Sequence, residues 1–550
     1  MTTPRGMVGL ALMGSLLGAS CGPGEPDPEA KALAAAAVAA AKAAEGFERA
    51  DRFVRGWWPH RDPQTGLYPQ NLFDTAPVWR VENSASDLWP FMVLTTWFTD
   101  RARYAGPMMD TLTNEIALTS RLGALPDDWN IAEQRFDADD LVDFDVVFGS
   151  AEYVKDGLIP IFERLGDPAF FARMTAIASQ LCNEPTAAAF TTAKGELLPA
   201  DDVEINGDVM LTMTRLYTAT GDERYLDCSQ RIAEYYLFEN PVIASESYRL
   251  RDHGGEMTAG LVEAYVGLDL AGRATEAHRV ALKDLLDRVL EVGRDEDGFF
   301  YDAVNLKTGA VTGPGLADTW GYTYAGYYAY DLAVGEDNYT NEVRRVLENL
   351  PKRMSYPWEP RGDVATGPLG SADGYADAIE SAIYLLNREP VQAGLDYLES
   401  EIQLLFAMQQ SDGVIEGWHG DGNFARTALL YAFMHSQGLF VEKWRRDVEI
   451  GAVRVGDELY VHLGADEPWS GGLCFDTPRH ATNLGLPYDY PRLNAFPEWF
   501  TVEADETYLV ETLSPVVDAR HLTGEELAAC LPVHLTADGL VHQLRVTLAR

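Results

Sequence analysis

The clearest structural pattern of the chain lies in residues 207–237, GDVMLTMTRLYTATGDERYLDCSQRIAEYYL. Apolar residues recur about every 3.6 positions on both sides of Gly221-Asp222, a spacing typical of two amphipathic helices. Glycine adopts the left-handed conformation that ends many helices, and an aspartate side chain accepts hydrogen bonds from the free N–H groups of a helix start. The stretch therefore predicts a helical hairpin with its turn at these two residues.

The same pattern recurs along the chain. Gly335-Glu336-Asp337-Asn338-Tyr339 forms an equivalent turn, and the helical period returns about fourteen times between residues 32 and 440. Helices joined by short turns pack as antiparallel neighbours. We expect a mainly α fold, an (α/α) hairpin toroid of about six to seven hairpins, built from segments 32–55, 85–99, 106–121, 150–165, 168–181, 207–219, 223–237, 255–271, 275–293, 319–334, 339–354, 374–387, 391–409 and 423–437.

The character of the sequence changes after residue 445. Residues 448–463 and 501–513 are rich in β-forming side chains, and residues 534–548 alternate apolar with polar positions. These patterns predict a small antiparallel β domain over residues 446–550, packed on a helical toroid over residues 32–445.

Several long connections contain Asp/Gly turns next to aromatic or apolar residues, as in Asp295-Glu296-Asp297-Gly298-Phe299-Phe300. Alternate connections of a closed ring of hairpins fall on one face. We therefore expect the loops at 62–69, 247–256, 295–318 and 411–423 to open on the same face of the toroid.

The composition indicates a large hydrophobic core and a strongly acidic surface. The 550 residues are 47% hydrophobic, which allows a large core, and they carry 43 Lys and Arg against 85 Asp and Glu, a formal charge of −42. A surface this acidic repels nucleic acid and anionic lipid, so a nucleic-acid partner is excluded. Solubility is the simplest explanation of the charge.

The N-terminus resembles a bacterial lipoprotein signal. Arg5 precedes a short apolar run, and Leu17-Gly18-Ala19-Ser20 places small residues directly before Cys21. The resemblance implies a signal over residues 1–21, lipidation of Cys21, a tether over residues 22–31, and attachment to the outer membrane or periplasmic side of the cell envelope through this anchor alone. An ordinary cleaved secretory signal is the alternative, and it also predicts export.

Four further cysteines, Cys182, Cys228, Cys474 and Cys530, contain no CxxC pair, so a structural zinc site is not expected. Cys182 and Cys228 lie in helical segments, and whether they pair is open. Buried free thiols are the favoured interpretation.

A hairpin toroid followed by a β domain resembles the six-hairpin glycosidases and the polysaccharide lyases on the same scaffold. The resemblance covers most of residues 32–550 and is nearest in character to the unsaturated-glucuronyl hydrolases, whose helix starts are similar to Ala317-Asp318-Thr319-Trp320-Gly321-Tyr322. Four segments also resemble stretches of uncharacterised bacterial envelope proteins: ENSASDLWPFMVLT (82–95), AEYVKDGLIPI (151–161), GNFARTALLYA (422–432) and YPRLNAFPEWF (490–500).

Glycoside hydrolysis on this scaffold needs two facing carboxyl groups, about 5–5.5 Å apart for retention and roughly 6.5–9.5 Å for inversion, with aromatic platforms for the sugar faces. The acidic loops supply the candidates for general acid and base, which are Glu256, Asp318, Glu416 and Asp421. Residues expected to contact or stack on the sugar are Glu82, Asp87, Asp252, His253, Trp320, Tyr322, Trp418, His419 and Arg426. Two further acidic groups near helix starts are weaker candidates: Asp373 and Asp377 with Glu380, and Asp201, Asp202 and Glu204 before Gly207-Asp208. Helix capping is the alternative role for Asp252, Asp318, Glu82 and Glu256.

The sequence favours a glycoside hydrolase that acts on acidic or plant and algal polysaccharide fragments. A polysaccharide lyase, with His253 and Tyr322 at the abstracted proton, is the first alternative. A non-catalytic glycan-binding lipoprotein is the second. The oligomeric state is not indicated.

No cofactor is expected, because P-loop, dinucleotide, GxSxG and HExxH motifs are missing from the sequence. Calcium is possible at the acidic run Asp137, Asp139, Asp140, Asp143 and Asp145, but this run lacks EF-hand spacing, and a solvated acidic face is favoured. In the β domain, Arg479 and Arg492 are expected to form an Arg–carboxylate brace between the domains.

Overall fold

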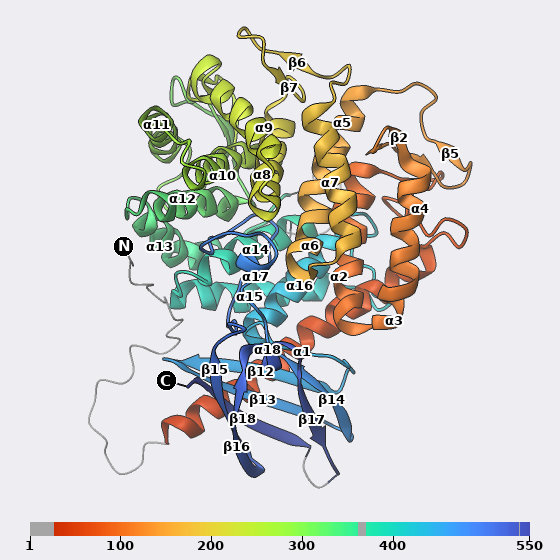
Figure 1. Cartoon of the computed structure of the whole chain (residues 1–550), viewed down its shortest axis with the longest axis vertical. Coiled ribbons are helices and arrows are strands. Elements are labelled where there is room, and N and C mark those ends of the chain that lie inside the picture. The colour runs from red at the N-terminus through yellow and green to blue at the C-terminus, as the bar shows by residue number, and fades with distance from the viewer. Residues whose placement is uncertain (1–26, 361–369, 538–539, 550) are drawn as a thin grey trace.

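The computed structural model describes residues 27–360, 370–537 and 540–549, without the side chains of residues 253, 254 and 516–518. Within these ranges seven inner helical elements form a closed ring, because each contacts the next and the last contacts the first (Figure 1). They are η2 (Val81–Leu88) with α2 (Trp89–Thr99), α5 (Asp143–Glu152) with η4 (Tyr153–Leu158) and α6 (Ile159–Leu165), α8 (Val203–Thr220), α10 (Glu256–Leu270), α12 (Trp320–Val334), α14 (Ala372–Leu386) and α16 (Asp421–Ser436).

An outer element alternates with each inner one. The outer elements are α1 (Pro28–Trp57), α3 (Arg101–Arg103) with η3 (Tyr104–Met108) and α4 (Met109–Thr119), α7 (Pro168–Asn183), α9 (Glu223–Glu234) with η5 (Tyr235–Glu239), α11 (Glu276–Val292), α13 (Thr340–Asn349) and α15 (Gln392–Met408). The described chain thus forms seven hairpins, which confirms the predicted toroid.

The sequence of each helix explains its layer. The inner helix α10 buries every residue from Glu256 to Leu268, whereas the outer helix α13 buries only Val343, Val346 and Leu347. A helix that is apolar all round belongs inside a fold, and a helix with a narrow apolar stripe belongs on its surface.

Short capped turns and long loops lie at opposite ends of the ring. Gly221 has a left-handed φ of 71°, and the Asp222 carboxylate accepts from the Arg224 backbone N–H, as predicted. The long loops all precede the N-termini of inner helices, and they are joined laterally: β8 (Tyr248–Arg249) pairs with β9 (Tyr301–Val304), and Leu72 N donates to Gly417 O at 2.9 Å. The predicted common face of the long loops is confirmed, and we call it the open face.

The C-terminal part contains two antiparallel sheets. β12 (Val448–Val455), β13 (Glu458–Ala465), β18 (Val541–Leu548), β15 (Thr507–Ser514) and β16 (Val516–Thr523) form one sheet in that order. The other sheet consists of β11 (Phe440–Val441), β14 (Trp469–Cys474) and β17 (Leu531–Leu535) in that order. The short helix α18 (Gly524–Ala528) packs against β14 and β17. The predicted antiparallel β domain is thus present.

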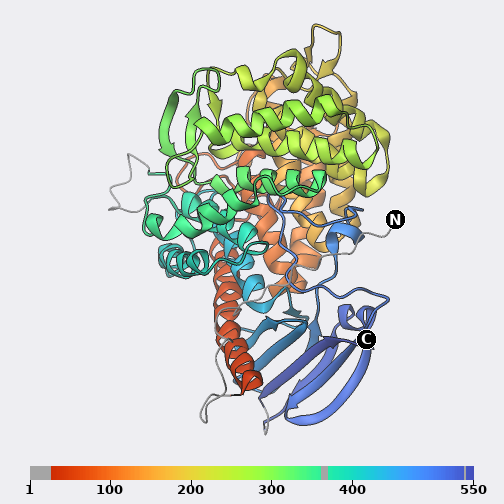
Figure 2. The ribbon, with the colours of Figure 1, turned by 90° about the vertical axis from the view of Figure 1, so that its left-hand side faces the viewer.

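Helix α1 joins the two parts of the molecule. Its first half lies on the β sheet, where a Cβ at Gly451 would come within 2.1 Å of the Ala40 backbone nitrogen, and its second half packs on α16 (Figure 2). The alanines of α1 permit this close approach. In the described part of the chain, no helix is both long and apolar enough to cross a membrane.

One segment, residues 475–502 with α17 (Arg479–Thr482), leaves the β domain and covers the C-terminal ends of the inner helices; we call it the plug. Arg492 contacts Glu163 of α6 at 2.5 Å, and Asp476 accepts from Arg164 of α6 at 2.8 Å and from Arg479 at 3.1 Å. The expected Arg–carboxylate brace is therefore present. Figure 2 shows the plug on one side of the helical body and the strands β8 to β10 on the other.

The four described cysteines form two disulfides, Cys182–Cys228 between α7 and α9 and Cys474–Cys530 within the β domain. The favoured interpretation of these residues as buried free thiols was therefore wrong. It failed because the spacing along the chain gives no sign that the two outer helices lie side by side.

Candidate active site

A cavity of about 390 Å³ opens among the N-terminal ends of the inner helices. Its lining is polar, and ten of its side chains are carboxylic. The lining residues are Glu82, Asn83, Asp87, Phe148, Glu152, Asp156, Glu204, Asp252, Glu256, Thr319, Tyr322, Glu359, Asp373, Asp377, Trp418, His419, Asn423, Arg426 and Asn494. The plug contributes Asn494, so the cavity is closed at its inner end.

The direction of the inner helices stabilises this acidic lining. Glu82, Glu204, Glu256 and Asp373 lie in the first turns of η2, α8, α10 and α14. A helix N-terminus carries a partial positive charge, which favours a nearby carboxylate by about 0.3–1 kcal/mol. Several such termini point at one cavity and offset part of the repulsion among the carboxylates.

Two π-helical stretches, η2 and η4, lie in the inner ring beside the cavity. Glu82 and Asp87 lie on η2, and Asp156 lies on η4. Element η4 directly follows α5, whose last residue is Glu152. Such widened turns occur frequently at functional sites.

Lys155 lies at the centre of a buried ionic cluster beneath one wall. Its Nζ atom lies 2.5 Å from Glu256, 2.9 Å from Asp156, 3.4 Å from Asp208 and 3.5 Å from Glu152. Burial lowers the pKa of Lys155, but the four carboxylates outweigh it and raise that pKa well above its ordinary value. Burial has the opposite effect on carboxyl groups, and it raises the pKa values of Asp156 and Asp208 well above their ordinary value.

Glycine makes this cluster possible. A Cβ at Gly207 would lie 2.9 Å from the Met257 nitrogen, and one at Gly260 would lie 2.7 Å from the Gly207 oxygen. The backbones of α8 and α10 therefore approach closely, and this brings Asp208 and Glu256 to the same ammonium group.

Arg426 organises the opposite wall and the floor. It donates to Glu380 at 2.5 Å, and to Tyr322, Asp377 and Asn494 at 3.2 Å each. Burial raises the pKa of Asp377 well above its ordinary value. Because Asn494 also donates to Asp156, a chain of hydrogen bonds crosses the floor from one wall to the other.

Glu82 differs from the buried acids, since it is half-buried and faces the cavity. Burial raises its pKa from 4.5 to about 7, with help from the carboxylates of Asp128 and Glu152 and against the opposing charge of Arg80. Glu82 therefore holds a proton near neutral pH at a position that a ligand can reach.

Trp418 and His419 form the rim next to Glu82 and Asp87. The Trp418 indole N–H donates to Glu416 at 2.8 Å, its ring meets the His419 ring edge to face at 4.4 Å, and His419 lies 3.9 Å from Asp87. The indole is thereby fixed at the cavity wall, where a sugar face can stack on it.

Of the four predicted catalytic residues, only Glu256 lines the cavity. Asp318 is buried behind the wall, 3.3 Å from Arg251, and burial raises its pKa to about 7. Glu416 supports Trp418 from outside the lining.

Asp421 is not placed for catalysis either. Its carboxylate accepts from the Trp57 indole at 2.9 Å and from the backbone N–H groups of Ile415, Glu416 and Gly417. Asp421 therefore holds a turn in place, and its glycine-rich surroundings in sequence reflect that turn.

Most predicted sugar contacts do line the cavity: Glu82, Asp87, Asp252, Tyr322, Trp418, His419 and Arg426. Trp320 does not, because it is fully buried against Phe299 and Tyr324, so its expected stacking role is corrected to a core role. The side chain of His253 lies outside the described residues.

Sequence reasoning missed Glu152, Lys155, Asp156 and Asn494. A signal for them existed, because the four segments singled out at 82–95, 151–161, 422–432 and 490–500 all contribute lining residues. These segments are distant in sequence and meet at this one cavity.

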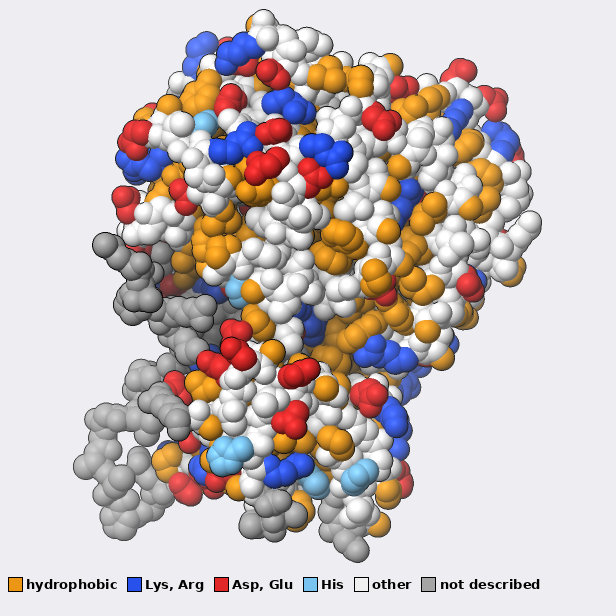
Figure 3. Space-filling model, in the orientation of Figure 1, with side chains coloured by type: hydrophobic (Ala, Val, Ile, Leu, Met, Phe, Trp, Pro, Cys, Tyr) orange, Lys and Arg blue, Asp and Glu red, His pale blue; other side chains and the backbone are white. Residues whose placement is uncertain are grey.

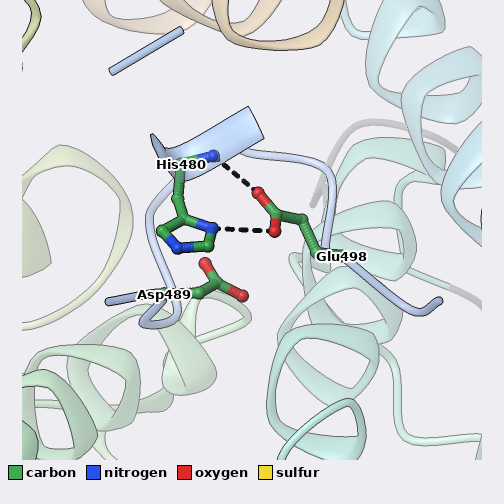
Figure 4. A group of neighbouring side chains, drawn as sticks. All are labelled: His480, Asp489 and Glu498. Atoms are coloured by element: carbon green, nitrogen blue, oxygen red, sulfur yellow. Dashed lines mark hydrogen bonds and ion pairs between the residues drawn. The ribbon is translucent and has the colours of Figure 1, made fainter. Parts of the chain in front are cut away.

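Two groups in the described chain bring three potential metal ligands together: Glu152, Asp208 and Glu256, and His480, Asp489 and Glu498. Lys155 already supplies a cation to the first. In the second, within the plug, Glu498 pairs with His480 at 2.8 Å (Figure 4). Asp489 of the same group pairs with Arg388 and Arg492. In the acidic run, Asp137 faces Arg80, Asp139 faces Arg135, and Asp143 accepts from the Ala187 N–H.

No model of a protein family and no curated protein matches the chain. Solved structures do match. The α-1,6-mannanase from Salegentibacter sp. HEL1_6 is 12% identical, with 58% of this chain and 96% of the mannanase covered at a TM-score of 0.40. A cellobiose 2-epimerase from Bacillus thermoamylovorans is 11% identical, with 71% and 99% covered at 0.38.

A glycosyl hydrolase family 88 protein from Bacteroides vulgatus is 14% identical, with 52% of this chain and 89% of that protein covered at a TM-score of 0.36. A polysaccharide lyase is also among the matches. Glycosidases and lyases are the groups that the sequence resembles, but likenesses this distant carry no argument about the reaction.

Proposed function

We propose that the protein is a glycoside hydrolase that binds the end of a neutral glycan in the cavity. One observation carries the proposal: the cavity holds two carboxyl groups in different electrostatic settings. Glu82 keeps a proton near neutral pH because of its burial, and Glu256 lies 2.5 Å from the Lys155 ammonium. Pairs of carboxyl groups whose surroundings differ in this way suit acid and base roles.

In this proposal Glu82 protonates the glycosidic oxygen as the bond breaks. Glu256 stabilises the positive charge that develops on the sugar, and it either attacks the anomeric carbon or activates a water molecule, according to the carboxyl separation in the complex. Trp418 and Tyr322 hold the sugar rings. The hydrogen-bonded floor of Asn494 and Arg426 limits how far the glycan enters.

Charge favours a neutral glycan over the acidic one expected from the sequence. The cavity lining contains ten carboxylic side chains and Arg426, and that guanidinium already contacts Glu380 and Asp377. A uronate would meet repulsion here, because Arg426 is the only Lys or Arg among the described lining residues and it is already paired. The same argument weakens the lyase alternative, since β-elimination needs a neutralised uronate carboxylate.

We also propose that the protein is exported and anchored through Cys21, as its N-terminal sequence indicates. Two disulfides in the described chain support an oxidising compartment, because such bonds are rare in the bacterial cytosol.

Turnover of a panel of neutral and acidic oligosaccharides tests the function. The wild type is expected to hydrolyse a neutral member, with activity that declines above about pH 7 as Glu82 loses its proton. Glu82→Gln and Glu256→Gln should each lower kcat by about two to four orders of magnitude. Glu296→Gln, at an exposed glutamate, is the control. Binding without turnover by the wild type would instead support a glycan-binding protein.

A further inference from the structure

The open face carries apolar side chains that the proposed chemistry does not use. Phe73 is 68% exposed and Phe144 is 44% exposed, and Leu141, Val142 and Val203 nearby are also exposed. All of them lie on segments that precede or begin inner helices, and the cavity opens at that end. Exposed apolar side chains grouped around a cavity can mark a ligand-binding groove, whereas single scattered apolar residues are ordinary on a protein surface.

The first ring continues the cavity wall outward. Phe148 on α5 lines the cavity, and Phe144 lies four residues earlier in the same helix. Residues four apart share one face of an α-helix, so the two rings form a stripe. Because the N-terminus of α5 is at the open face, the stripe runs from the cavity toward solvent.

The second ring lies beside Trp418. Leu72 N donates to Gly417 O at 2.9 Å, Asn71 forms a β-bridge with Trp418, and the Phe73 ring lies 3.7 Å from the place where a side chain on Gly417 would begin. Phe73 is therefore next to the platform that lines the cavity, on the solvent side.

We propose that Phe73 and Phe144 form outer subsites for a neutral glycan chain whose end occupies the cavity, with Phe148 as the link between them and the interior. This inference rests on the proposed function. A cavity of about 390 Å³ lies near the lower end of the usual range for ligand sites, so most of a longer glycan chain would lie outside it. Aromatic faces bind the C–H faces of sugars and leave the hydroxyl groups in water.

A membrane is the other occupant that an apolar rim suggests, but the charge opposes it. The cavity beside these rings is lined by the acidic residues Glu82, Asp87 and Glu204, and the whole chain carries a formal charge of −42. An anionic lipid surface repels such a site.

The test measures binding of neutral oligosaccharide ladders to the full chain carrying Glu82→Gln, in which hydrolysis of the probes should be slower by about two to four orders of magnitude. The probes are α-1,6-linked mannose and β-1,4-linked glucose oligomers of two to six residues, measured by titration calorimetry. We expect affinity to rise with length in one ladder. Phe73→Ala and Phe144→Ala should weaken binding of the longest member about 3- to 10-fold and leave the disaccharide nearly unchanged.

Phe238→Ala is the matched control, because Phe238 is 40% exposed but lies on η5 in the outer ring. Equal losses for short and long probes, or no dependence on length in either ladder, would overturn the inference. Loss of binding to phosphatidylcholine vesicles in the two variants, with glycan binding intact, would assign the rim to a membrane. The proposed function has its own test. If the wild type hydrolyses a disaccharide, the proposed function holds whatever these variants show, and if it hydrolyses no glycan, the proposed function is wrong.

Discussion

Replacing Glu82 by glutamine should stabilise the protein at alkaline pH while it removes the proposed acid. The folded protein holds the pKa of Glu82 at about 7 against an ordinary value of 4.5, chiefly through burial. The folded state therefore binds this proton more tightly than the unfolded state does. The stability that results is fully present below pH 4.5 and is lost as pH rises through 7.

The magnitude follows from that interval. One pH unit corresponds to about 1.4 kcal/mol, so complete burial would give roughly 3 kcal/mol. Glu82 is partly exposed, and solvent screening reduces this to about 1–2 kcal/mol. The amide never ionises, so the variant avoids the loss. Its stability relative to wild type should rise by about 1–2 kcal/mol between pH 5 and pH 8.

Urea denaturation of both proteins at the two pH values, with the m-values compared, measures this difference. Glu296→Gln should show no such change. A Glu82→Gln protein whose stability relative to wild type is the same at pH 8 as at pH 5 would show that Glu82 is ionised in the folded protein, and the proposed acid would then be unsupported.

Three further outcomes are expected. Asp421→Ala should destabilise the protein by about 2–4 kcal/mol in thermal or urea unfolding, because several buried N–H groups lose their acceptor; an unchanged stability would contradict the structural role. Lys155→Ala should cost about 3–5 kcal/mol by leaving buried carboxylates without a cation, and millimolar Mn²⁺ should restore part of the Tm of this variant but not raise that of the wild type. Cys21→Ser should abolish fatty-acid labelling in cells, and equal labelling of both proteins would exclude the anchor.

The fold was predictable because its signals are local. Turns such as Gly221-Asp222 mark the helix ends, and the helical period marks the helices between them. The number of hairpins and the common face of the long loops follow from these signals. The plug was not predictable, because residues 475–502 lack regular periodicity and their partners, such as Glu163, are hundreds of positions away.

The candidate site was predicted in part for a similar reason. Glu82, next to Asn83 and Ser84 at a helix start, and Trp418, in a glycine-rich acidic loop, were recognisable from their local sequence, and both line the cavity. Lys155 and Asp208 lie inside apolar helices, where charged residues suggest surface positions until the packing of neighbouring helices is known. Asp421 shows the converse error, since a carboxylate that satisfies a buried turn has the same local sequence as one that faces a ligand.

On the face that the plug covers, acidic and basic side chains are interspersed, and no single-sign patch dominates the view in Figure 3. The face that the plug covers thus contrasts with the cavity, whose lining holds ten carboxylic side chains and one arginine.

The plug also has a consequence for how the chain must be made. Its Asn494 completes the floor, and its Arg492 and Asp476 meet Glu163 and Arg164, which are translated more than 300 residues earlier. Helix α1, near the start of the chain, likewise packs on β12, which is synthesised about 400 residues later. Synthesis proceeds from the N-terminus, so the ring is made before the plug that closes its inner end and covers its buried ions. The complete site can therefore form only after residues 475–502 have been synthesised, and a chain ending at residue 445 would lack Asn494 and with it part of the cavity floor.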